Sequence, residues 1–598
     1  MDGLLDADEI WIALGQFGKF QRIQLALILI GIIPLAFHLL SAVFIAYRPP
    51  FLCNETTVDM IFGDDVHNMY ENVSYNFVYN KCSIDVFTDS TNSTLLKSTG
   101  CVSGYSYPVP KDRTLVTEWD LVCDRAQLSE FSQTLVILGQ AFGAAIFTSL
   151  ADKFGRRKIH VLGHISLFTI SFAIAWSPNY TVFAVLRFIL GAVQQGSGLT
   201  MAILSLEILP LKARYIGECL GLVFWTTGVN LLSPIGYLFR NLSWRYLQMT
   251  LALFSCYSLV EYWLMDESVR WLLANGRIKH AERIIRKAAK MNGKNFDDVI
   301  KAATIQSSKE MEVFVPKKDT LDLSLKKEED ILINKNGAEY TAMKDSSEIA
   351  NNEVELGFPQ GEEQSVVPAP IKRYNVTTIF RHKVILFNSL ILWYTWLVNS
   401  LVYYALSLTS SALSGDRFVN YFLIAIVEYP AAIMELLLIN RIGRRKTCIL
   451  FHVIAGIALT VSTVCKTLSD GAGTLGAVSL VFNLVGKFGI TGSFSTIFLY
   501  TPELYPTNLR NAGIGISSSV ARIGGMLAPF AGPLMDYITW GPGAISAVMC
   551  LLAVYLLTFL PETAGYELPT TIEELKTWYK AHAGDKKVKP VEEDNTKI

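Results

Sequence analysis

Two short basic stretches determine the organisation of this chain: Ala-Asp-Lys-Phe-Gly-Arg-Arg-Lys at residues 151–158 and Asn-Arg-Ile-Gly-Arg-Arg-Lys at residues 440–446. Each stretch lies between two long apolar runs, which indicates one membrane unit that occurs twice. Repeated membrane bundles with matching cationic hairpins are typical of secondary transporters, whose halves move about a central site. A substrate site is therefore expected away from the hairpins, inside the bundles.

The composition also indicates a membrane protein. Of the 598 residues, 51% are hydrophobic and 18% are charged, and the mean hydropathy is +0.34. These values are too apolar for a soluble protein of this size. The net charge of −1 gives no basic excess that would suggest nucleic acid as a partner. The first apolar run, residues 23–47, is too long for a signal peptide, so it is predicted to be the first span.

Apolar runs of about 20 residues predict an all-α membrane protein with twelve transmembrane helices in two bundles of six. The bundles cover residues 21–265 and 382–560, flanked by an N-terminus at 1–20, a middle loop at 266–381 and a tail at 561–598. The spans are expected at residues 21–47, 129–151, 158–177, 181–206, 214–239, 244–265, 382–409, 417–439, 447–466, 475–500, 510–537 and 541–560.

Positive charges in the short loops predict the orientation. Lys and Arg gather after spans two, four, eight and ten, and the positive-inside rule places these loops in the cytoplasm. Both termini and the middle loop are then cytoplasmic, and the loop at residues 48–128 is extracellular. The lipid bilayer is the expected surrounding, and the chain is predicted to be a multi-pass protein of the plasma membrane.

The large first loop has two features of an extracellular segment. It carries three glycosylation sequons, at Asn54, Asn72 and Asn92. It also carries four of the nine cysteines, namely Cys53, Cys82, Cys101 and Cys123. A loop too polar to bury its own core is expected to be held together by disulfides, with three pairings open and free thiols as the alternative.

The middle loop changes character along its length. Residues 278–291 have helical spacing with Lys, Arg and Glu on the polar positions, which predicts an amphipathic helix at the inner membrane face. Residues 317–370 are rich in Lys, Glu, Ser and Asn and poor in aromatics, which predicts disorder.

Three ionisable side chains are expected deep in the membrane. Arg522 lies twelve residues after Arg510 at the inner end of span eleven, which places it about 18 Å deep. The same count places Glu428 about 17 Å from the outer end of span eight and Lys487 about 20 Å from the inner end of span ten. Buried charges are costly and usually functional. An internal ion pair of Glu428 with either basic residue is the alternative.

Span seven offers an aromatic surface. Trp396, Asn399, Tyr403 and Tyr404 recur at helical spacing and share one face. Such rings can hold a quaternary ammonium group by cation–π attraction, while Glu428 complements its charge and Arg522 receives a carboxylate in two hydrogen bonds. A small zwitterion with both groups fits this set. Ordinary packing is the alternative for the rings.

The hairpins predict a gate on the cytoplasmic side. Asp152 is expected to interact with the positive N-terminus of a neighbouring helix, such as span eleven, and with nearby arginines, so that it latches this side shut. Acid–base pairs are expected at the same level between Glu207 and Arg214, Glu267 and Arg270, and Glu503 and Arg510. The other gating candidates are Arg156, Arg157, Arg444 and Arg445. A role only in topology and lipid binding is the alternative.

Several motifs resemble a known family. Asp-Lys-Phe-Gly-Arg-Arg-Lys from Asp152 resembles the cytoplasmic motif of the major facilitator superfamily. The segment at 267–277 resembles a signature that follows span six in its organic ion transporter and sugar porter branches. The segments at 118–123 and 281–290 are similar to the organic cation, carnitine and organic anion transporters within it. Residues 486–491 and 500–511 look most like the carnitine branch. The chain departs from the family pattern at Thr148, Asn440, Asp266 and Val269.

The resemblance implies roles for individual residues. Transporters of simple organic cations generally have Asp at the position of Arg522, whereas carnitine-type and anion-type members have Arg. Glu428 matches a carboxylate of the cation and carnitine members, and Gln194 aligns with a polar position implicated in the carnitine branch.

The sequence therefore predicts a transporter of organic cations and carnitine-like zwitterions that works by alternating access. An organic anion exchanger and a non-transporting receptor with the same fold are the alternatives. The sequence contains no phosphate loop, nucleophile elbow or cluster with metal-ligand spacing, so neither an enzyme nor a bound metal or cofactor is expected. The coupling ion, Na⁺ or H⁺, and the oligomeric state stay open.

Overall fold

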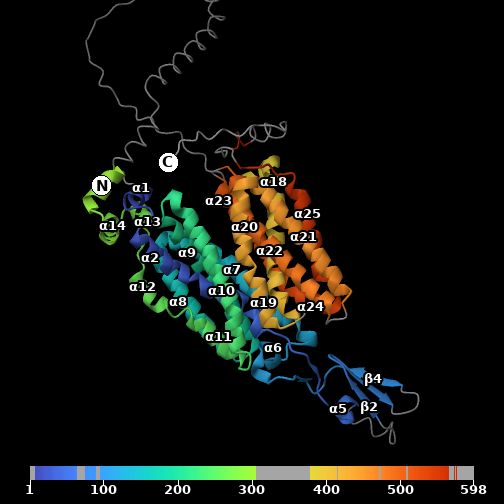
Figure 1. Cartoon of the computed structure of the whole chain (residues 1–598). Helices are drawn as coiled ribbons and strands as arrows, with labels where there is room; N and C mark the ends of the chain where they lie inside the picture. Colours follow the sequence, from blue (N-terminus) through green and yellow to red (C-terminus); the bar gives the residue numbers. More distant parts are fainter. Residues whose placement is uncertain are drawn as a thin grey trace, which may run out of the picture.

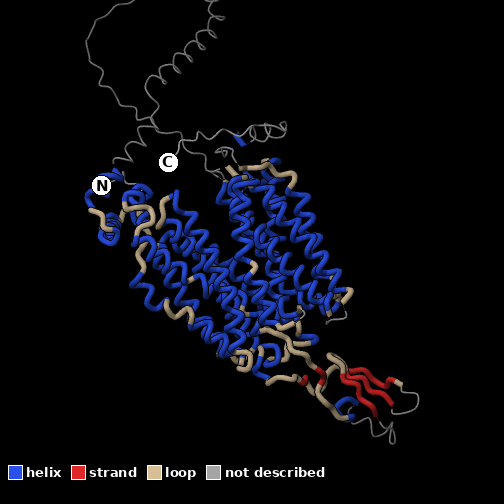
Figure 2. The backbone as a smooth tube through the Cα atoms, in the orientation of Figure 1, coloured by secondary structure: helices blue, strands red, loops and turns tan. Residues whose placement is uncertain are grey.

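The computed structural model describes residues 7–62, 75–88, 94–304, 377–413, 415–469, 473–506, 509–564, 572, 574 and 575. Two helical bundles lie side by side, one from each half of the chain, and a small domain with strands lies beyond one end of them (Figures 1 and 2). We call this small domain, residues 48–122, the loop domain. The bundle end next to it is the loop-domain end, and the opposite end, where both basic hairpins lie, is the hairpin end.

The first bundle begins with a helix that is broken twice. Lys19–Ile30 (α2), Ile32–Leu40 (α3) and Ala42–Ile45 (α4) follow one another with breaks at Gly31 and Ser41. Four long helices continue the bundle: Gln127–Phe154 (α7), Arg156–Ala175 (α8), Tyr180–Glu207 (α9) and Arg214–Leu238 (α10). The sixth predicted span is two helices, Trp244–Leu253 (α11) and Ser258–Leu264 (α12).

The second bundle has the same order. It contains Lys383–Leu408 (α18), Arg417–Ile426 (α19), Glu428–Ile442 (α20), Arg444–Thr467 (α21), Thr474–Glu503 (α22), Arg510–Leu527 (α23), Ala531–Tyr537 (α24) and Gly541–Leu557 (α25). A short helix, Thr377–Arg381 (α17), precedes it. Ten helical segments in the described chain are long and apolar enough to cross a membrane, and α25 is shorter; with the α11–α12 pair as the remaining span, this agrees with a six-plus-six arrangement.

Glycine ends the helix at the same point of both hairpins. Gly155 between α7 and α8 has φ +109°, and Gly443 between α20 and α21 has φ +91°. L side chains rarely adopt this left-handed region, so glycine allows two membrane helices to meet without an intervening loop. The twofold repeat seen in the sequence is thus a repeat of backbone geometry.

The loop domain corrects two expectations. It contains a three-stranded antiparallel sheet of Tyr75–Tyr79 (β2), Ile84–Thr88 (β3) and Leu95–Thr99 (β4), and a pair of Leu52–Cys53 (β1) with Tyr105–Ser106 (β5), so the fold is not purely helical. The domain also has a small core around Ile84 and Val86, with 0% exposure each.

Disulfides join Cys53 to Cys101 and Cys82 to Cys123. Val58–Phe62 (α5) covers part of the domain. Of the sequons, Asn54 is half-buried, with Nδ2 donating to the Ser103 carbonyl at 3.0 Å, and Asn72 and Asn92 lie outside the described residues.

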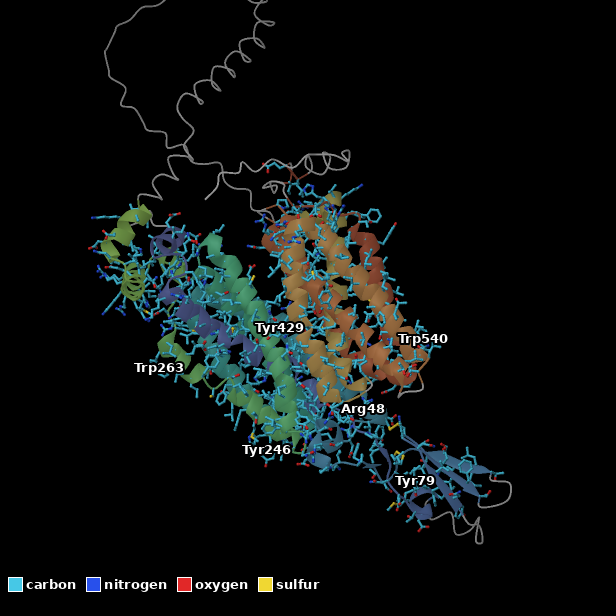
Figure 3. All side chains as sticks on the ribbon, viewed as in Figure 1. Arg48, Tyr79, Tyr246, Trp263, Tyr429 and Trp540 are labelled. Carbon is cyan, nitrogen blue, oxygen red and sulfur yellow. A yellow bond between two sulfur atoms is a disulfide. The ribbon has the colours of Figure 1, made fainter. Side chains whose placement is uncertain are left out.

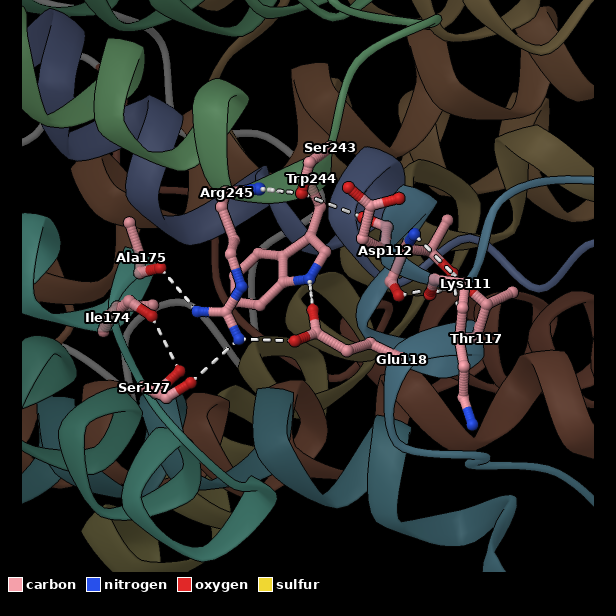
Figure 4. A network of polar contacts seen from close by, with 11 residues as sticks. Lys111, Asp112, Thr117, Glu118, Ile174, Ala175, Ser177, Ser243, Trp244 and Arg245 are labelled. Atoms are coloured by element: carbon pink, nitrogen blue, oxygen red, sulfur yellow. Dashed lines mark hydrogen bonds and ion pairs between the residues drawn. The ribbon is translucent and has the colours of Figure 1, made fainter.

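A polar network anchors the loop domain to the first bundle (Figure 4). Glu118, at the end of Leu115–Glu118 (α6), accepts hydrogen bonds from Trp244 Nε1 at 2.6 Å and from Arg245 at 2.5 Å. Arg245 also donates to the carbonyls of Ala175 and Ser177, at 2.6 and 2.9 Å. One arginine therefore ties α11 to both the α8–α9 turn and the loop domain.

The two halves share an apolar core at the loop-domain end. Phe44 stacks on Phe418 of α19 with ring centroids 5.2 Å apart, and Arg417 lies 3.8 Å from the centre of the Tyr47 ring. Ser233 of α10 donates to the Phe418 carbonyl at 2.6 Å. In Figure 1 the bundles meet near α6 and α19 and diverge toward the hairpin end.

The amphipathic segment after the first bundle is helical, as predicted. Ile278–Asn292 (α14) packs with Val269–Ala274 (α13) and with Ala7–Ala13 (α1) in a separate apolar cluster at the hairpin end. The stretch predicted to be disordered, residues 317–370, lies outside the described residues.

Candidate functional site

Glu428 and Lys487 form a buried ion pair in the second bundle. Lys487 Nζ of α22 lies 3.1 Å from Glu428 Oε1 at the start of α20, and their side chains are 0% and 2% exposed. Lys487 also donates to Ser407 Oγ at 2.8 Å and lies 3.2 Å from the centre of the Tyr403 ring. Of the alternatives for Glu428, the structure therefore has the internal ion pair, with Lys487 as its partner.

Tyr403 connects this pair to the other half. Its hydroxyl donates to Glu428 Oε1 at 2.7 Å and accepts a long hydrogen bond, 3.4 Å, from Trp225 Nε1 of α10. Nearby, the hydroxyls of Thr227 and Tyr429 are 2.7 Å apart, and Figure 3 places Tyr429 at the boundary between the bundles. The charge pair thus lies next to the contact surface between the halves.

Other residues of the predicted aromatic face have different surroundings. Trp396 is 1% exposed, packs against Phe498 at 4.4 Å between ring centroids, and donates to Thr501 Oγ1 at 2.8 Å. It is a packing residue in this structure. Asn399 is fully buried, and neither polar atom of its side chain has a hydrogen-bond partner among the described residues.

Arg522 is a cation of this region that has no acidic partner in the described part of the chain. Its Nη1 donates to the carbonyl and the hydroxyl of Ser518, at 2.9 and 2.7 Å, so the guanidinium turns back one helical turn toward the hairpin end. Tyr404 is close enough for a direct electrostatic interaction. No ion pair of Arg522 occurs between residues that the structure describes, and its Nε is buried without a partner there.

A second intramembrane carboxylate, Glu435, was not identified from the sequence. It lies seven residues after Glu428 on α20 and is 2% exposed. Ser495 of α22 lies close enough for a polar interaction with it, and Oε1 has no hydrogen-bond partner in the described part of the chain. The sequence could have indicated Glu435 through its spacing from Glu428, because residues seven apart share a helix face.

Gln194 lies in the first bundle, among helix contacts. Its Nε2 donates to the Leu35 carbonyl at 2.5 Å, and its Oε1 accepts from Gln140 Nε2 at 3.0 Å. The side chain is 3% exposed. These bonds link α9 to α3 and α7.

In the first hairpin, the acidic groups find partners within their own half. Asp152 pairs with Arg156 at 2.9 Å, and Arg156 also reaches Glu207 at 3.4 Å. Glu267 accepts from the Arg157 backbone N–H at 3.0 Å and so caps α8. Among the residues that the structure describes, the expected contact of Asp152 with the start of span eleven does not occur in this state.

The expected pairs of Glu207 with Arg214 and of Glu267 with Arg270 are replaced by others. Arg214 and Arg270 both reach Asp8 of α1, at 3.4 and 2.7 Å. Asp8 was missed because a polar N-terminus gives no spacing that identifies a partner.

The second hairpin repeats the arrangement of the first. Glu562 accepts from the backbone N–H groups of Arg444 and Arg445, at 2.8 and 3.3 Å, as Glu267 does in the first half. Arg444 pairs with Glu503 at 3.3 Å, which replaces the expected Glu503–Arg510 pair; Arg510 donates to the Pro502 carbonyl. The role of Glu562 could have been predicted from the sequence, because Pro-Glu-Thr at 561–563 parallels Asp-Glu-Ser at 266–268.

The described part of the chain also contains a cluster of metal-ligand type that the sequence spacing did not indicate. Glu261 of α12 lies 2.8 Å from His160 Nε2 and 3.0 Å from His164 Nδ1 of α8, and all three side chains are 0% exposed. Two imidazoles and a carboxylate are zinc ligands in other proteins, so the cluster could hold a metal ion. In the structure, hydrogen bonds across it tie α8 to α12.

Comparisons with known proteins agree on one family. The model of the sugar (and other) transporter family matches residues 80–327 and 351–575. Solute carrier family 22 member 21 of Mus musculus is 30% identical, with 96% of this chain and 94% of that protein covered. The chain belongs to solute carrier family 22 of the major facilitator superfamily.

The names of similar proteins refer to several substrate classes. Organic cation/carnitine transporter 2 of Homo sapiens is 29% identical, with 95% of this chain and 94% of that protein covered. Organic anion transporter 3 of Mus musculus is 28% identical, with 96% and 94% covered. The solved xylose transporter XylE from E. coli, in a partially occluded inward open conformation, has a TM-score of 0.54 at 14% identity, with 92% of this chain and 100% of that chain covered.

This last match supports the major facilitator fold alone. The family shows that this solute carrier is a membrane transporter of small organic substrates and not an enzyme.

Proposed function

We propose that this solute carrier moves carnitine-like zwitterions and organic cations across the plasma membrane by alternating access. The bundles at residues 21–265 and 382–560 are the moving halves. The hairpin end and both termini face the cytoplasm, and the loop domain faces outside. The chemistry at Arg522 and the relatives named as organic cation/carnitine transporters support this proposal.

The observation that carries the proposal is the guanidinium of Arg522, which has no ion-pair partner among the described residues. An unpaired charge inside a membrane is costly, so a substrate group of opposite sign stabilises it. A carboxylate fits best, because the planar guanidinium receives it in two charge-assisted hydrogen bonds. A zwitterion brings this carboxylate together with an ammonium group, for which the half-buried Tyr404 ring next to Arg522 is a suitable surface.

An organic anion exchanger is the second candidate, and the ion pair of Glu428 with Lys487 favours it. Lys487 compensates the carboxylate of Glu428, so this carboxylate attracts a cation less strongly than an unpaired one would. Arg522 alone then selects a negative substrate. The relative named organic anion transporter 3 fits this candidate.

Alternating access requires a contact at the hairpin end that forms only when the transporter opens outward. Asp152, which pairs with Arg156 here, is the proposed latch toward α23 in that other state. The Asp152→Asn variant is expected to lower initial uptake while its amount at the cell surface stays unchanged. Unchanged uptake rates would rule out the latch.

Uptake into proteoliposomes tests the substrate class. Carnitine, tetraethylammonium and para-aminohippurate are compared, with and without Na⁺ and with an imposed pH gradient, which also identifies the coupling ion. We expect carnitine uptake, loss of that uptake in Arg522→Asp, and partial uptake in Arg522→Lys, which keeps the charge but not the two parallel hydrogen bonds of the guanidinium. Carnitine uptake that persists in Arg522→Asp contradicts the proposal, and uptake of para-aminohippurate alone assigns the anion exchanger.

A further inference from the structure

Two helices of the second bundle, α20 and α22, face each other with two polar contacts along their length. In the first contact, Glu428 of α20 meets Lys487 of α22, and the charges compensate each other at 3.1 Å. The second contact lies about two helical turns further toward the hairpin end. There Glu435 of α20 meets Ser495 of α22, eight residues after Lys487. Serine is a polar but uncharged neighbour, so the second carboxylate has no ion-pair partner among the described residues.

From these contacts we propose that Glu435 is the carboxylate that receives the cationic group of the substrate. The proposal rests on the function proposed above and assigns the ammonium end of the zwitterion to Glu435 rather than to Glu428. Glu435 is 2% exposed, and its Oε1 has no hydrogen-bond partner among the described residues. A buried carboxylate without a cation is costly unless a ligand completes the site.

The depth of Glu435 matches the depth of the guanidinium that would hold the other end of the substrate. Glu435 precedes Arg441, at the inner end of α20, by six residues, which corresponds to about 9 Å. The Arg522 guanidinium bonds to Ser518, eight residues after Arg510, which corresponds to about 12 Å from the same membrane face. Glu428 lies about 20 Å from that face by the same count, well above the guanidinium.

Glu435 also lies where the two halves of the transporter meet. Cys219 of α10, in the first bundle, is close enough to Glu435 for a direct electrostatic interaction. Helices α10 and α20 are in contact across the boundary between the bundles. A cation bound at Glu435 would therefore contact both halves, as a substrate must do if its binding is to drive their movement.

The native thiol of Cys219 reports directly on this site. Cys219 is half-buried. In the purified full chain, mass spectrometry distinguishes its labelling from that of the other free thiols, Cys256, Cys448, Cys465 and Cys550. The labelling rates of Cys219 with two methanethiosulfonate reagents of opposite charge are compared. Each rate is divided by the rate at which the same reagent reacts with free 2-mercaptoethanol. We expect the cationic reagent to be favoured about tenfold at Cys219 in the natural chain, and this preference to disappear in Glu435→Gln.

Protection by a substrate probe is the second measurement. Carnitine, and separately tetraethylammonium, should slow the labelling of Cys219. In Glu435→Gln the half-protecting concentration is expected to rise about tenfold or more, because a charge-assisted contact is lost. Glu218→Gln, which removes the neighbouring carboxylate of α10, and Ser495→Ala, which keeps the charge of Glu435, are the matched controls and should keep the protection.

The outcomes separate this inference from the proposed function. If the natural chain takes up carnitine but Glu435→Gln shows the same protection, Glu435 is not the contact and the inference fails alone. Absence of any charge preference at Cys219 in the natural chain also overturns it, because the carboxyl is then neutral. Unchanged labelling of Cys465 shows that the variant is folded. If no zwitterion or cation enters proteoliposomes at all, the proposed function fails.

Discussion

Replacing Lys487 with methionine isolates the energetic role of the buried ion pair. Methionine keeps the length and most of the volume of the side chain, so little cavity is created. The change removes the 3.1 Å contact with Glu428 and the 2.8 Å hydrogen bond to Ser407. Because Glu428 is 1% exposed, its carboxylate is left in the membrane interior with the Tyr403 hydrogen bond as its remaining support from the described residues.

The expected loss follows from this burial. Removing one partner of a buried pair costs about 3–5 kcal/mol, because the remaining charge is uncompensated. The retained Tyr403 hydrogen bond to the carboxylate is worth about 1.5–3 kcal/mol and places the expected loss at the lower end, about 3 kcal/mol. The double variant Lys487→Met with Glu428→Gln removes both charges and is expected to lie within about 1 kcal/mol of the natural chain.

Unfolding of the purified chain in mixed micelles measures these differences. Lys466→Met is the matched control, since Lys466 on α21 is half-buried next to Met535 and has no ion pair among the described residues; its expected cost is below about 1 kcal/mol. A single Lys487→Met variant as stable as the control would refute the reasoning. A double variant no more stable than the single one would refute it as well.

Three further changes test contacts at the two ends of the molecule. Glu562→Gln weakens the cap at the start of α21 and should cost about 1 kcal/mol, with faster amide hydrogen exchange in that first turn; exchange as slow as in the natural chain would contradict the cap. Asp8→Asn removes the partner of two arginines and should release α1, which limited proteolysis near residue 15 would detect, whereas an unchanged cleavage pattern would show that apolar packing alone holds α1. Glu118→Gln weakens the charge-assisted bond to Arg245 but leaves an acceptor for Trp244. The free energy of unfolding should fall by about 1–2 kcal/mol and thermal unfolding should begin at a slightly lower temperature; an identical unfolding curve would count against the anchor.

The helices were predictable because the membrane imposes one rule on every span. Backbone groups in lipid must be bonded within the helix, so apolar length alone locates the spans. The breaks were not predictable, since Gly31 and residues 254–257 interrupt runs that are otherwise apolar. The strands of the loop domain were predictable in principle, because Ile84–Thr88 alternates apolar and polar positions at its start.

Partners of the charged residues were harder to predict than their depth. Counting residues placed Glu428 and Lys487 in the membrane interior, yet depth says nothing about which way a side chain points around its helix. Packing between the helices sets that rotation. As a result, Glu428 pairs with Lys487 rather than with Arg522. Asp8 could not be assigned at all, because α1 is brought to the first hairpin by apolar contacts far apart in the sequence.

The seal between the halves at the loop-domain end has a consequence for how the transporter responds to its solution. Among the described residues it consists mainly of stacked rings and apolar side chains around Phe44 and Phe418, with an ion pair of the half-buried Arg48 and the exposed Asp536 at its edge. Ionic strength has little effect on such a seal, whereas cooling weakens the apolar contribution. The hairpin end also carries partly exposed acid–base clusters, which salt screens. Temperature and salt therefore act on opposite faces of the same molecule, so that cold favours opening toward the loop domain and low salt strengthens the clusters at the hairpins.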